Sequence, residues 1–212
     1  FDQYLASAKK AEAAGDFHAA EKEYEKALAI RPDGETFQRL GLVRHMQNEF
    51  DRAIPAFEKA IRLKPDLWGA YLFLGIDCYR TNQFPKALTV LTHAAKLRPA
   101  EPEVQFWLGT THIALKHYLD GQEILEELSK RQLENLEVLR ILAQSYSDYA
   151  VALHNRVAAE HPASAWAFRI HGQALESEGF CEAALAEYRK AQALKPDMEG
   201  VRESITRCQA KH

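Results

Sequence analysis

The sequence has few of the residues that build disulfide scaffolds and turn-rich folds. Only 3 of its 212 residues are Cys, which argues against a fold held by disulfide bonds, and 10 Gly and 8 Pro are few for a chain rich in turns. No apolar run approaches the ~18 uncharged residues that a membrane-spanning helix needs. Lys and Arg (27) do not outnumber Asp and Glu (30), so the basic excess of a dedicated nucleic-acid binder is missing.

The amino terminus lacks two further features. Residues 1–4 contain no basic segment followed by an apolar one, so we expect no signal peptide at this start. No Met begins the chain, and we therefore expect it to be a processed or trimmed piece. The sequence leaves the compartment open, either cytoplasmic or, if a leader has been removed, periplasmic.

An internal repeat is present instead. Glycines recur at a constant interval, at Gly41, Gly75 and Gly109. Other small residues and the large residues that follow them keep the same register: Ala20, Ala53, Ala87 and Ala184; Tyr24, Phe57, Leu91 and Tyr188; Pro32, Pro65, Pro99 and Pro196. Because one register accounts for all these coincidences, the repeat is the main structural signal of the chain.

Each repeat contains two helical patterns. In the third, residues 71–78 and residues 87–94 each place apolar side chains at steps of three and four, the spacing of one helix face. A polar break, Thr81-Asn82-Gln83, separates the two patterns. A small residue where the two helices cross lets their backbones approach, and a large side chain of the partner helix fills the remaining space.

The repeats resemble the tetratricopeptide repeat, a helix–turn–helix unit of about 34 residues. The segment from Ala165 carries the pattern well: Phe168, His171, Gly172, Leu175, Gly179, Ala184, Tyr188, Ala191 and Pro196. The resemblance implies an all-α fold, a right-handed superhelical solenoid of about six such repeats with a C-terminal capping helix. Over residues 1–212 we expect a single domain with units 1–33, 34–67, 68–101, 102–135, 136–164 and 165–198, and a capping helix over 198–211.

The fifth unit is shortened. The interval from Gly109 to Gly172 is five positions shorter than two full repeats, and the missing positions fall between Tyr146 and Pro162. An apolar stripe crosses that gap without Gly or Pro: Leu139, Leu142, Tyr146, Tyr149, Leu153 and Val157. We expect one continuous helix of roughly 25 residues there. The alternative is two short helices that meet at Ser147-Asp148.

The sequence offers no sign of a catalytic, metal or cofactor site. His112 and His117 are five positions apart and would not share a face on one helix, so we expect His112, like His171, to be a packing residue. Cys78 occupies a core position, and Cys181 and Cys208 lack the spacing of metal ligands. Gly-rich phosphate loops and nucleophile-elbow serines are also missing, so we expect no enzyme and no cofactor.

The resemblance implies that the first helix of each unit lines a concave face, which cradles a peptide or a partner helix. Carrying the register over assigns these groove residues: Arg39, Leu42, Leu72, Phe73, Ile76, Arg80, Phe106, Trp107, Thr110, Arg140, Gln144, Arg169 and Gln173. The middle of this set is aromatic and apolar, with Arg on both sides. It suits an apolar or aromatic segment with an acidic flank. The alternative is that Phe73 and Trp107 only pack on each other.

One specific ligand of the family is not expected here. Co-chaperone members of the family clamp the terminal carboxylates of heat-shock chaperones with a basic and Asn cluster. The corresponding positions hold Leu5, Lys9, Arg39, Gly69 and Phe73, of which only Lys9 and Arg39 are polar donors. We therefore expect that the chain does not bind the chaperone tail.

The sequence favours a non-catalytic protein–protein interaction scaffold that binds a partner peptide or helix in the groove. Its expected partner is another protein, without nucleic acid and without a membrane span. Two alternatives stay open. The chain is the recruiting or regulatory segment of a larger protein or enzyme, or it is a repeat module that self-assembles into a homo-oligomer.

Overall fold

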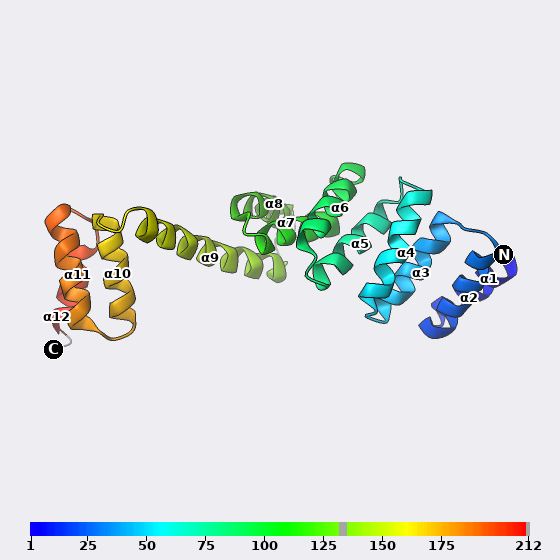
Figure 1. The fold of residues 1–212 in the computed structure, drawn as a ribbon, viewed down its shortest axis with the longest axis horizontal. Helices are drawn as coiled ribbons and strands as arrows, with labels where there is room; N and C mark the ends of the chain where they lie inside the picture. Colours follow the sequence, from blue (N-terminus) through cyan, green and yellow to red (C-terminus); the bar gives the residue numbers. More distant parts are fainter. Residues whose placement is uncertain (132–134, 211–212) are drawn as a thin grey trace. The chain divides into compact units, whose positions relative to one another are not determined.

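The computed structural model describes residues 1–131 and 135–210, and these form twelve helices and no strand (Figure 1). The helices are α1 (Asp2–Ala13), α2 (Phe17–Ile30), α3 (Gly34–Met46), α4 (Phe50–Leu63), α5 (Trp68–Arg80), α6 (Phe84–Leu97), α7 (Pro102–Ala114), α8 (Tyr118–Arg131), α9 (Leu136–Glu160), α10 (Ala165–Ser177), α11 (Cys181–Leu194) and α12 (Val201–Ala210). The all-α repeat solenoid expected from the sequence is confirmed. Residues 132–134 of the expected fourth unit and residue 211 of the expected capping helix lie outside the described residues.

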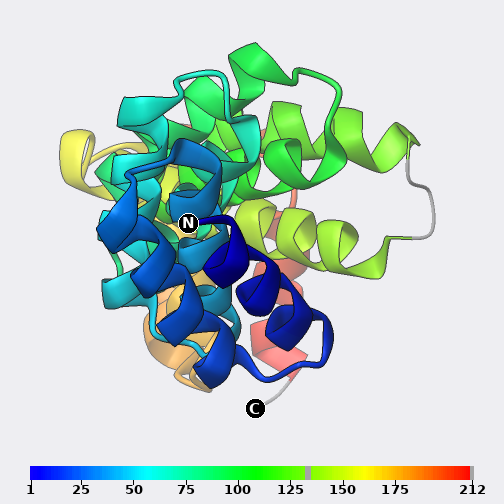
Figure 2. The ribbon, with the colours of Figure 1, turned by 90° about the vertical axis from the view of Figure 1, so that its right-hand side faces the viewer.

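Consecutive helices form antiparallel hairpins, in which α1 packs on α2, α3 on α4, α5 on α6, α7 on α8 and α10 on α11 (Figures 1 and 2). Each hairpin turns at a residue with left-handed backbone: Gly15 (φ 75°), Asn48 (φ 59°), Asn82 (φ 59°), Lys116 (φ 63°) and Gly179 (φ 87°). Gly and Asn reach this conformation most easily, which explains why they occupy four of these five turns.

The repeated glycines lie where the two helices of a hairpin cross. A Cβ atom on Gly41 would lie 2.6 Å from Cε1 of Phe57, and one on Gly172 would lie 2.6 Å from Cε1 of Tyr188. Both large side chains are fully buried. In the α5–α6 and α7–α8 hairpins the large residue is Leu91 or Leu125. In four hairpins, therefore, the glycine lets a large side chain of the second helix pack directly on the backbone of the first, as expected from the sequence.

The chain divides into two compact units, Phe1–Ser145 and Tyr146–His212. In the first, buried side chains form three clusters that follow one another from α1 to the start of α9, each shared by neighbouring hairpins. In the second, α10, α11 and α12 share one cluster. In α12, Val201 and Cys208 are buried in this cluster and Ile205 packs against it, so the helix covers the apolar side of the last hairpin.

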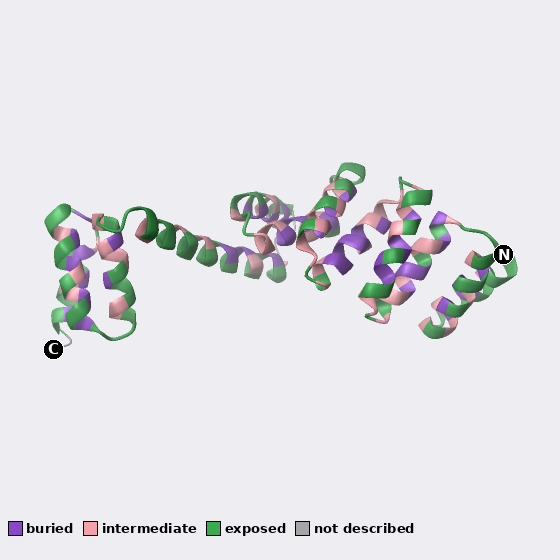
Figure 3. Ribbon diagram, viewed as in Figure 1, coloured by how far each residue is buried: buried purple, intermediate pink, exposed green. Residues whose placement is uncertain are grey.

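Helix α9 is continuous over 25 residues, so the interpretation as one long helix is correct. Its buried residues, Val138, Leu142 and Ser145, all lie in its first half (Figure 3). Tyr146 and Val151 are about half exposed. Tyr149, Leu153 and Val157, farther along the same stripe, are partly buried. Among the described residues, no helix has both the length and the apolar character needed to cross a bilayer.

Candidate functional site

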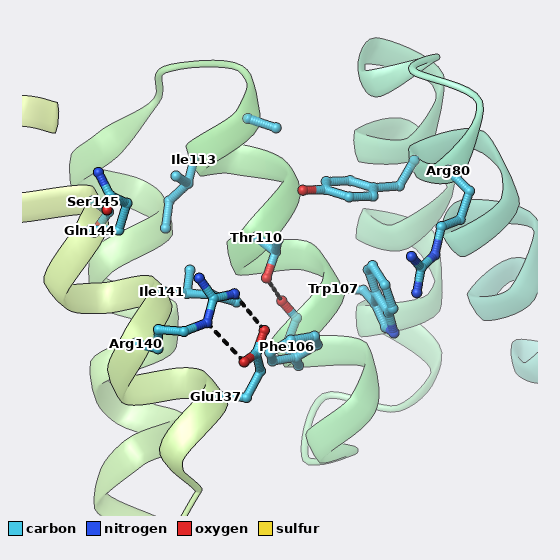
Figure 4. A pocket seen from close by; sticks show the side chains of 12 residues that line it. Arg80, Phe106, Trp107, Thr110, Ile113, Glu137, Arg140, Ile141, Gln144 and Ser145 are labelled. Atoms are coloured by element: carbon cyan, nitrogen blue, oxygen red, sulfur yellow. Dashed lines mark hydrogen bonds and ion pairs between the residues drawn. The ribbon is translucent and has the colours of Figure 1, made fainter.

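A pocket of about 490 Å³ opens in the first compact unit (Figure 4). Helices α5, α7 and α9 supply its walls. The lining residues are Tyr79, Arg80, Phe106, Trp107, Thr110, Ile113, Ala114, Glu137, Arg140, Ile141, Gln144 and Ser145. These helices are the first helices of three successive units, so the pocket lies on the face that the family resemblance assigns to ligands.

The aromatic wall of the pocket comes from α5 and α7. The Trp107 ring meets Phe106 and Tyr79 edge to face, each at 5.4 Å between ring centroids. Trp107 is half-buried: it packs against one of the core clusters of the first unit and also lines the pocket. This geometry leaves apolar aromatic surface for a ligand while the packing holds it in place.

The charged groups of the pocket differ in whether they have partners. The Arg80 guanidinium lies over the Trp107 ring, 5.4 Å from its centroid. Among the described residues, Arg80 makes no ion pair. Arg140 instead forms two hydrogen bonds with Glu137, of 2.6 and 3.0 Å, which lower the pKa of Glu137 (Figure 4). Arg80 is therefore the cation of this pocket that remains available for an acidic ligand group.

Two polar side chains of the wall are already engaged. The Thr110 hydroxyl donates a 2.7 Å hydrogen bond to the carbonyl of Phe106, and the Ser145 hydroxyl donates one of 2.8 Å to the carbonyl of Leu142. Both residues are buried. They shape the pocket rather than present free donors.

The structure brings six of the residues assigned to the groove together in this pocket: Arg80, Phe106, Trp107, Thr110, Arg140 and Gln144. Leu72 and Ile76 lie elsewhere, with exposed fractions of 1% and 4%, because they face the core of the first unit. Leu42 also packs against that core. Arg39 is exposed, and its Nη1 pairs with Glu12 at 3.0 Å.

The suggested packing of Phe73 on Trp107 is not observed among the described ring contacts. Phe73 instead stacks on Phe57 at 6.2 Å and meets His45 at 5.1 Å. Both of these partners belong to the preceding unit. The ring contacts of Trp107 are instead with Tyr79 and Phe106.

Sequence reasoning missed half of the pocket: Tyr79, Ile113, Ala114, Glu137, Ile141 and Ser145. Two of these could have been found, because Tyr79 and Ile113 occupy the same position in successive repeats. Glu137 and Ile141 lie four positions apart on α9. They could be assigned to the pocket only once the orientation of α9 against α7 was known.

Arg169 and Gln173 belong to a separate pocket of about 300 Å³ in the second compact unit. Its other lining residues are Leu153, His154, Val157, Trp166 and Ile170. Trp166 is half exposed, with Arg169 and Lys195 over its ring at 5.4 and 5.6 Å. Of the thirteen groove residues assigned from the sequence, six line the first pocket and two line this one.

The expected core position of Cys78 is confirmed, whereas the expected packing role of His171 is not. Cys78 is fully buried, as its register position predicts, and burial raises the pKa of its thiol to about 11. Cys181 and Cys208 are also buried. His171, expected to be a packing residue, is exposed on α10, so this expectation was wrong.

Comparison with known proteins agrees with this architecture. A family model described as "Tetratricopeptide repeat" matches residues 5–67 and residues 40–102. A crystal structure of MamA protein is similar with a TM-score of 0.59 at 20% identity, over 92% of this chain and 91% of that one. YrrB, described as a TPR protein with an unusual peptide-binding site, is similar with a TM-score of 0.53 at 19% identity, over 86% and 97%.

A further similar structure contains a peptide. It is the first TPR of Spaghetti (RPAP3) bound to the HSP90 peptide SRMEEVD, with a TM-score of 0.53 at 17% identity, over 56% of this chain and 94% of that one. At these identities the solved structures show the fold alone.

Curated relatives are longer proteins. The "Peroxisomal targeting signal receptor" of Candida albicans is 27% identical over 119 residues, which are 54% of this chain and 20% of the receptor. "Cilia- and flagella-associated protein 70" of Homo sapiens is 25% identical over 129 residues, 59% of this chain and 11% of that protein. The chain therefore matches about a fifth or less of the length of these relatives.

Repeats of this type are generally non-catalytic and serve as protein–protein interaction scaffolds. The register of glycines, the hairpins built on it, the family model and the similar folds agree. Over residues 5–102, where the family model matches, the chain consists of tetratricopeptide repeats.

Proposed function

We propose that the pocket between α5, α7 and α9 binds a short segment of a partner protein, with an apolar or aromatic side chain inside and an acidic group beside it. The observation that carries this proposal is that a half-buried Trp107 lines the pocket beside the Arg80 guanidinium, which has no ion-pair partner among the described residues. The aromatic surface would bury the apolar side chain. The guanidinium would pair with a carboxylate at the pocket edge.

Two features support a peptide rather than a small molecule. The pocket is built from the first helices of three successive units, so an extended chain can continue past it. Two proteins of similar fold are described with a peptide or a peptide-binding site. A rigid repeat surface is already ordered before binding. The conformational entropy lost on binding is therefore that of the peptide.

The test uses fluorescein-labelled heptapeptides and fluorescence polarisation. One peptide has a central Trp flanked by Asp, a second has the same Trp flanked by Lys, and the third is SRMEEVD. We expect the Asp-flanked peptide to bind more tightly than the Lys-flanked one. The SRMEEVD peptide is expected not to bind, because the carboxylate clamp is incomplete.

The chain offers a matched pair of variants. Arg80→Glu should weaken binding of the Asp-flanked peptide about tenfold, equivalent to ~1.4 kcal/mol. Arg98→Glu is the control, because Arg98 also lies over a tryptophan, Trp68, at 5.8 Å, but lines no part of this pocket. Equal effects of the two variants, or equal binding of the Asp- and Lys-flanked peptides, would contradict the proposal.

A second candidate function rests on the relatives. Both curated relatives are much longer than this chain, which favours a recruiting or regulatory segment within a larger protein. Reading the gene on both sides of the segment tests this directly. An open reading frame that encodes a further folded domain supports it, and stop and start signals at the two ends contradict it.

A further inference from the structure

Two histidines and an aspartate meet at the turn between α7 and α8. His112 lies near the end of α7, His117 lies in the turn, and Asp120 lies in the first turn of α8. Each offers one ligand atom, and these three atoms all lie within 4.8 Å of one another. The three residues belong to the first compact unit and line neither of the pockets described above.

The turn itself brings the two imidazoles together. On one continuous helix a spacing of five would place them on different faces. Helix α7 ends at Ala114, however, and Lys116 adopts the left-handed backbone. The amide of His117 then donates a 2.9 Å hydrogen bond to the carbonyl of His112, and the two ring centroids lie 5.8 Å apart.

His112 has a ring nitrogen without a protein partner. Its Nδ1 is buried and has no hydrogen bond from or to any described residue. The nearest carboxylate oxygen, Oδ2 of Asp120, is 3.8 Å away, beyond hydrogen-bond distance. A buried polar atom left without a partner is unfavourable. A ligand between His112 and Asp120 would remove this penalty.

We propose that His112, His117 and Asp120 form a binding site for one divalent transition-metal ion, with zinc as its best fit. Two imidazole nitrogens and one carboxylate oxygen are ligands that zinc takes in sites with three protein ligands, which leave the fourth position to water. Two nitrogen ligands disfavour the hard cations Mg²⁺ and Ca²⁺, which prefer oxygen.

The site can reach zinc geometry through small side-chain movements. Ligand atoms on a tetrahedral zinc are about 3.3 Å apart, given bond lengths near ~2.0 Å. His117 and Asp120 are exposed, so their side chains can rotate to close the present separation. The partly buried His112 provides the fixed ligand.

Isothermal titration calorimetry with ZnCl₂ on chain first treated with chelator tests the proposal. The wild-type chain is expected to bind one Zn²⁺ in a saturable step and to show no such step with MgCl₂. His117→Ala and Asp120→Asn each remove one exposed ligand and should weaken zinc binding by about tenfold or more. His171→Ala, which removes an exposed histidine on α10, should leave zinc binding unchanged.

A thermal measurement separates a lost ligand from a damaged fold. Zinc should raise the Tm of the wild type and of His171→Ala, since the metal binds the folded state, and should not raise that of the two ligand variants. The proposal is overturned if the wild type shows no saturable zinc binding. It is also overturned if His117→Ala and Asp120→Asn bind zinc as the wild type does.

Discussion

The hydroxyl of Tyr188 donates a 2.7 Å hydrogen bond to Oε2 of Glu176, while Nε of Arg207 donates one of 3.0 Å to Oε1 of the same carboxylate. The N-terminal hairpin repeats the arrangement, with Tyr24 and Arg39 donating to the two oxygens of Glu12. Both tyrosines are fully buried. In each case the second helix of a hairpin supplies a buried tyrosine hydroxyl, and a glutamate of the first helix accepts its hydrogen bond. An arginine of the following helix pairs with the same carboxylate.

Tyr188 should make stability sensitive to alkaline pH. Burial and the hydrogen bond to Glu176 raise the pKa of Tyr188 to about 12, above the value near 10 in an unfolded chain. The folded state therefore holds this proton more tightly. Its contribution to stability is complete below pH 10 and is lost as the pH rises from 10 to 12.

The measurement compares urea unfolding of wild type and Tyr188→Phe at pH 8 and at pH 11. The variant should lose about 1 kcal/mol at pH 8, because Glu176 loses one donor. Between the two pH values its unfolding free energy should fall by less than that of the wild type. Parallel losses in both chains would show that the tyrosine does not carry the effect.

The buried pair of His45 and Asp77 should behave as one energetic unit. His45 Nδ1 lies 2.5 Å from Oδ1 of Asp77, whose side chain is fully buried and whose other oxygen has no hydrogen bond to any described residue. Burial raises the pKa of Asp77, and the hydrogen bond from His45 opposes this rise. Asp77 thus favours folding most at low pH, and this contribution declines as the pH rises from its unfolded value of 3.8 through the folded pKa.

His45→Ala should lower the unfolding free energy by about 3 kcal/mol at pH 7, because it leaves a buried carboxylate unpaired. Adding Asp77→Asn to that variant should recover part of the loss, since the neutral amide is less unfavourable when buried. Denaturant unfolding of the wild type, the two single variants and the double variant gives the four unfolding free energies of a double-mutant cycle. Additive losses would mean that the two side chains are not coupled.

Lys116 occupies a turn position that suits Gly or Asn better. It has φ 63°, where the matching residues of other units are Gly15, Asn48, Asn82 and Gly179. A side chain other than Gly or Asn is disfavoured in this conformation by about 1 kcal/mol. Lys116→Gly should therefore raise the unfolding free energy by about this amount, whereas Asn82→Gly should change it little. Thermal unfolding compares the two, and a Tm for Lys116→Gly at or below the wild-type value would contradict the prediction.

Gly41 should not tolerate a methyl group. The added Cβ would lie 2.6 Å from the Phe57 ring, which is fully buried and cannot move aside. Gly41→Ala is expected to cost about 1–3 kcal/mol through overpacking. Gly69→Ala provides the control on α5, because its Cβ would meet only the end of the Gln38 side chain at 3.1 Å. Denaturant unfolding of both variants checks this, and equal stabilities would exclude close packing as the cause.

The hairpins and the long helix could be predicted from the sequence. The geometry of a hairpin depends on residues that are close along the chain, such as Gly41 against Phe57 and the turn at Asn48. Residues of these types recur at the same positions in successive repeats and can therefore be recognised in the sequence. Helix α9 could also be predicted, because an apolar stripe runs from Leu139 to Val157 without Gly or Pro.

Only the tertiary structure decided which first-helix residues reach the pocket and which histidines meet. The register gives Leu72 and Phe106 the same position in successive repeats, but it does not tell that the first is buried and the second lines a pocket. That outcome depends on how the next hairpin packs. His112 and His117 likewise come together through a left-handed turn at Lys116, a backbone reversal that helical spacing does not represent. The repeat is thus a local property of the chain, whereas its binding surfaces result from contacts between distant residues.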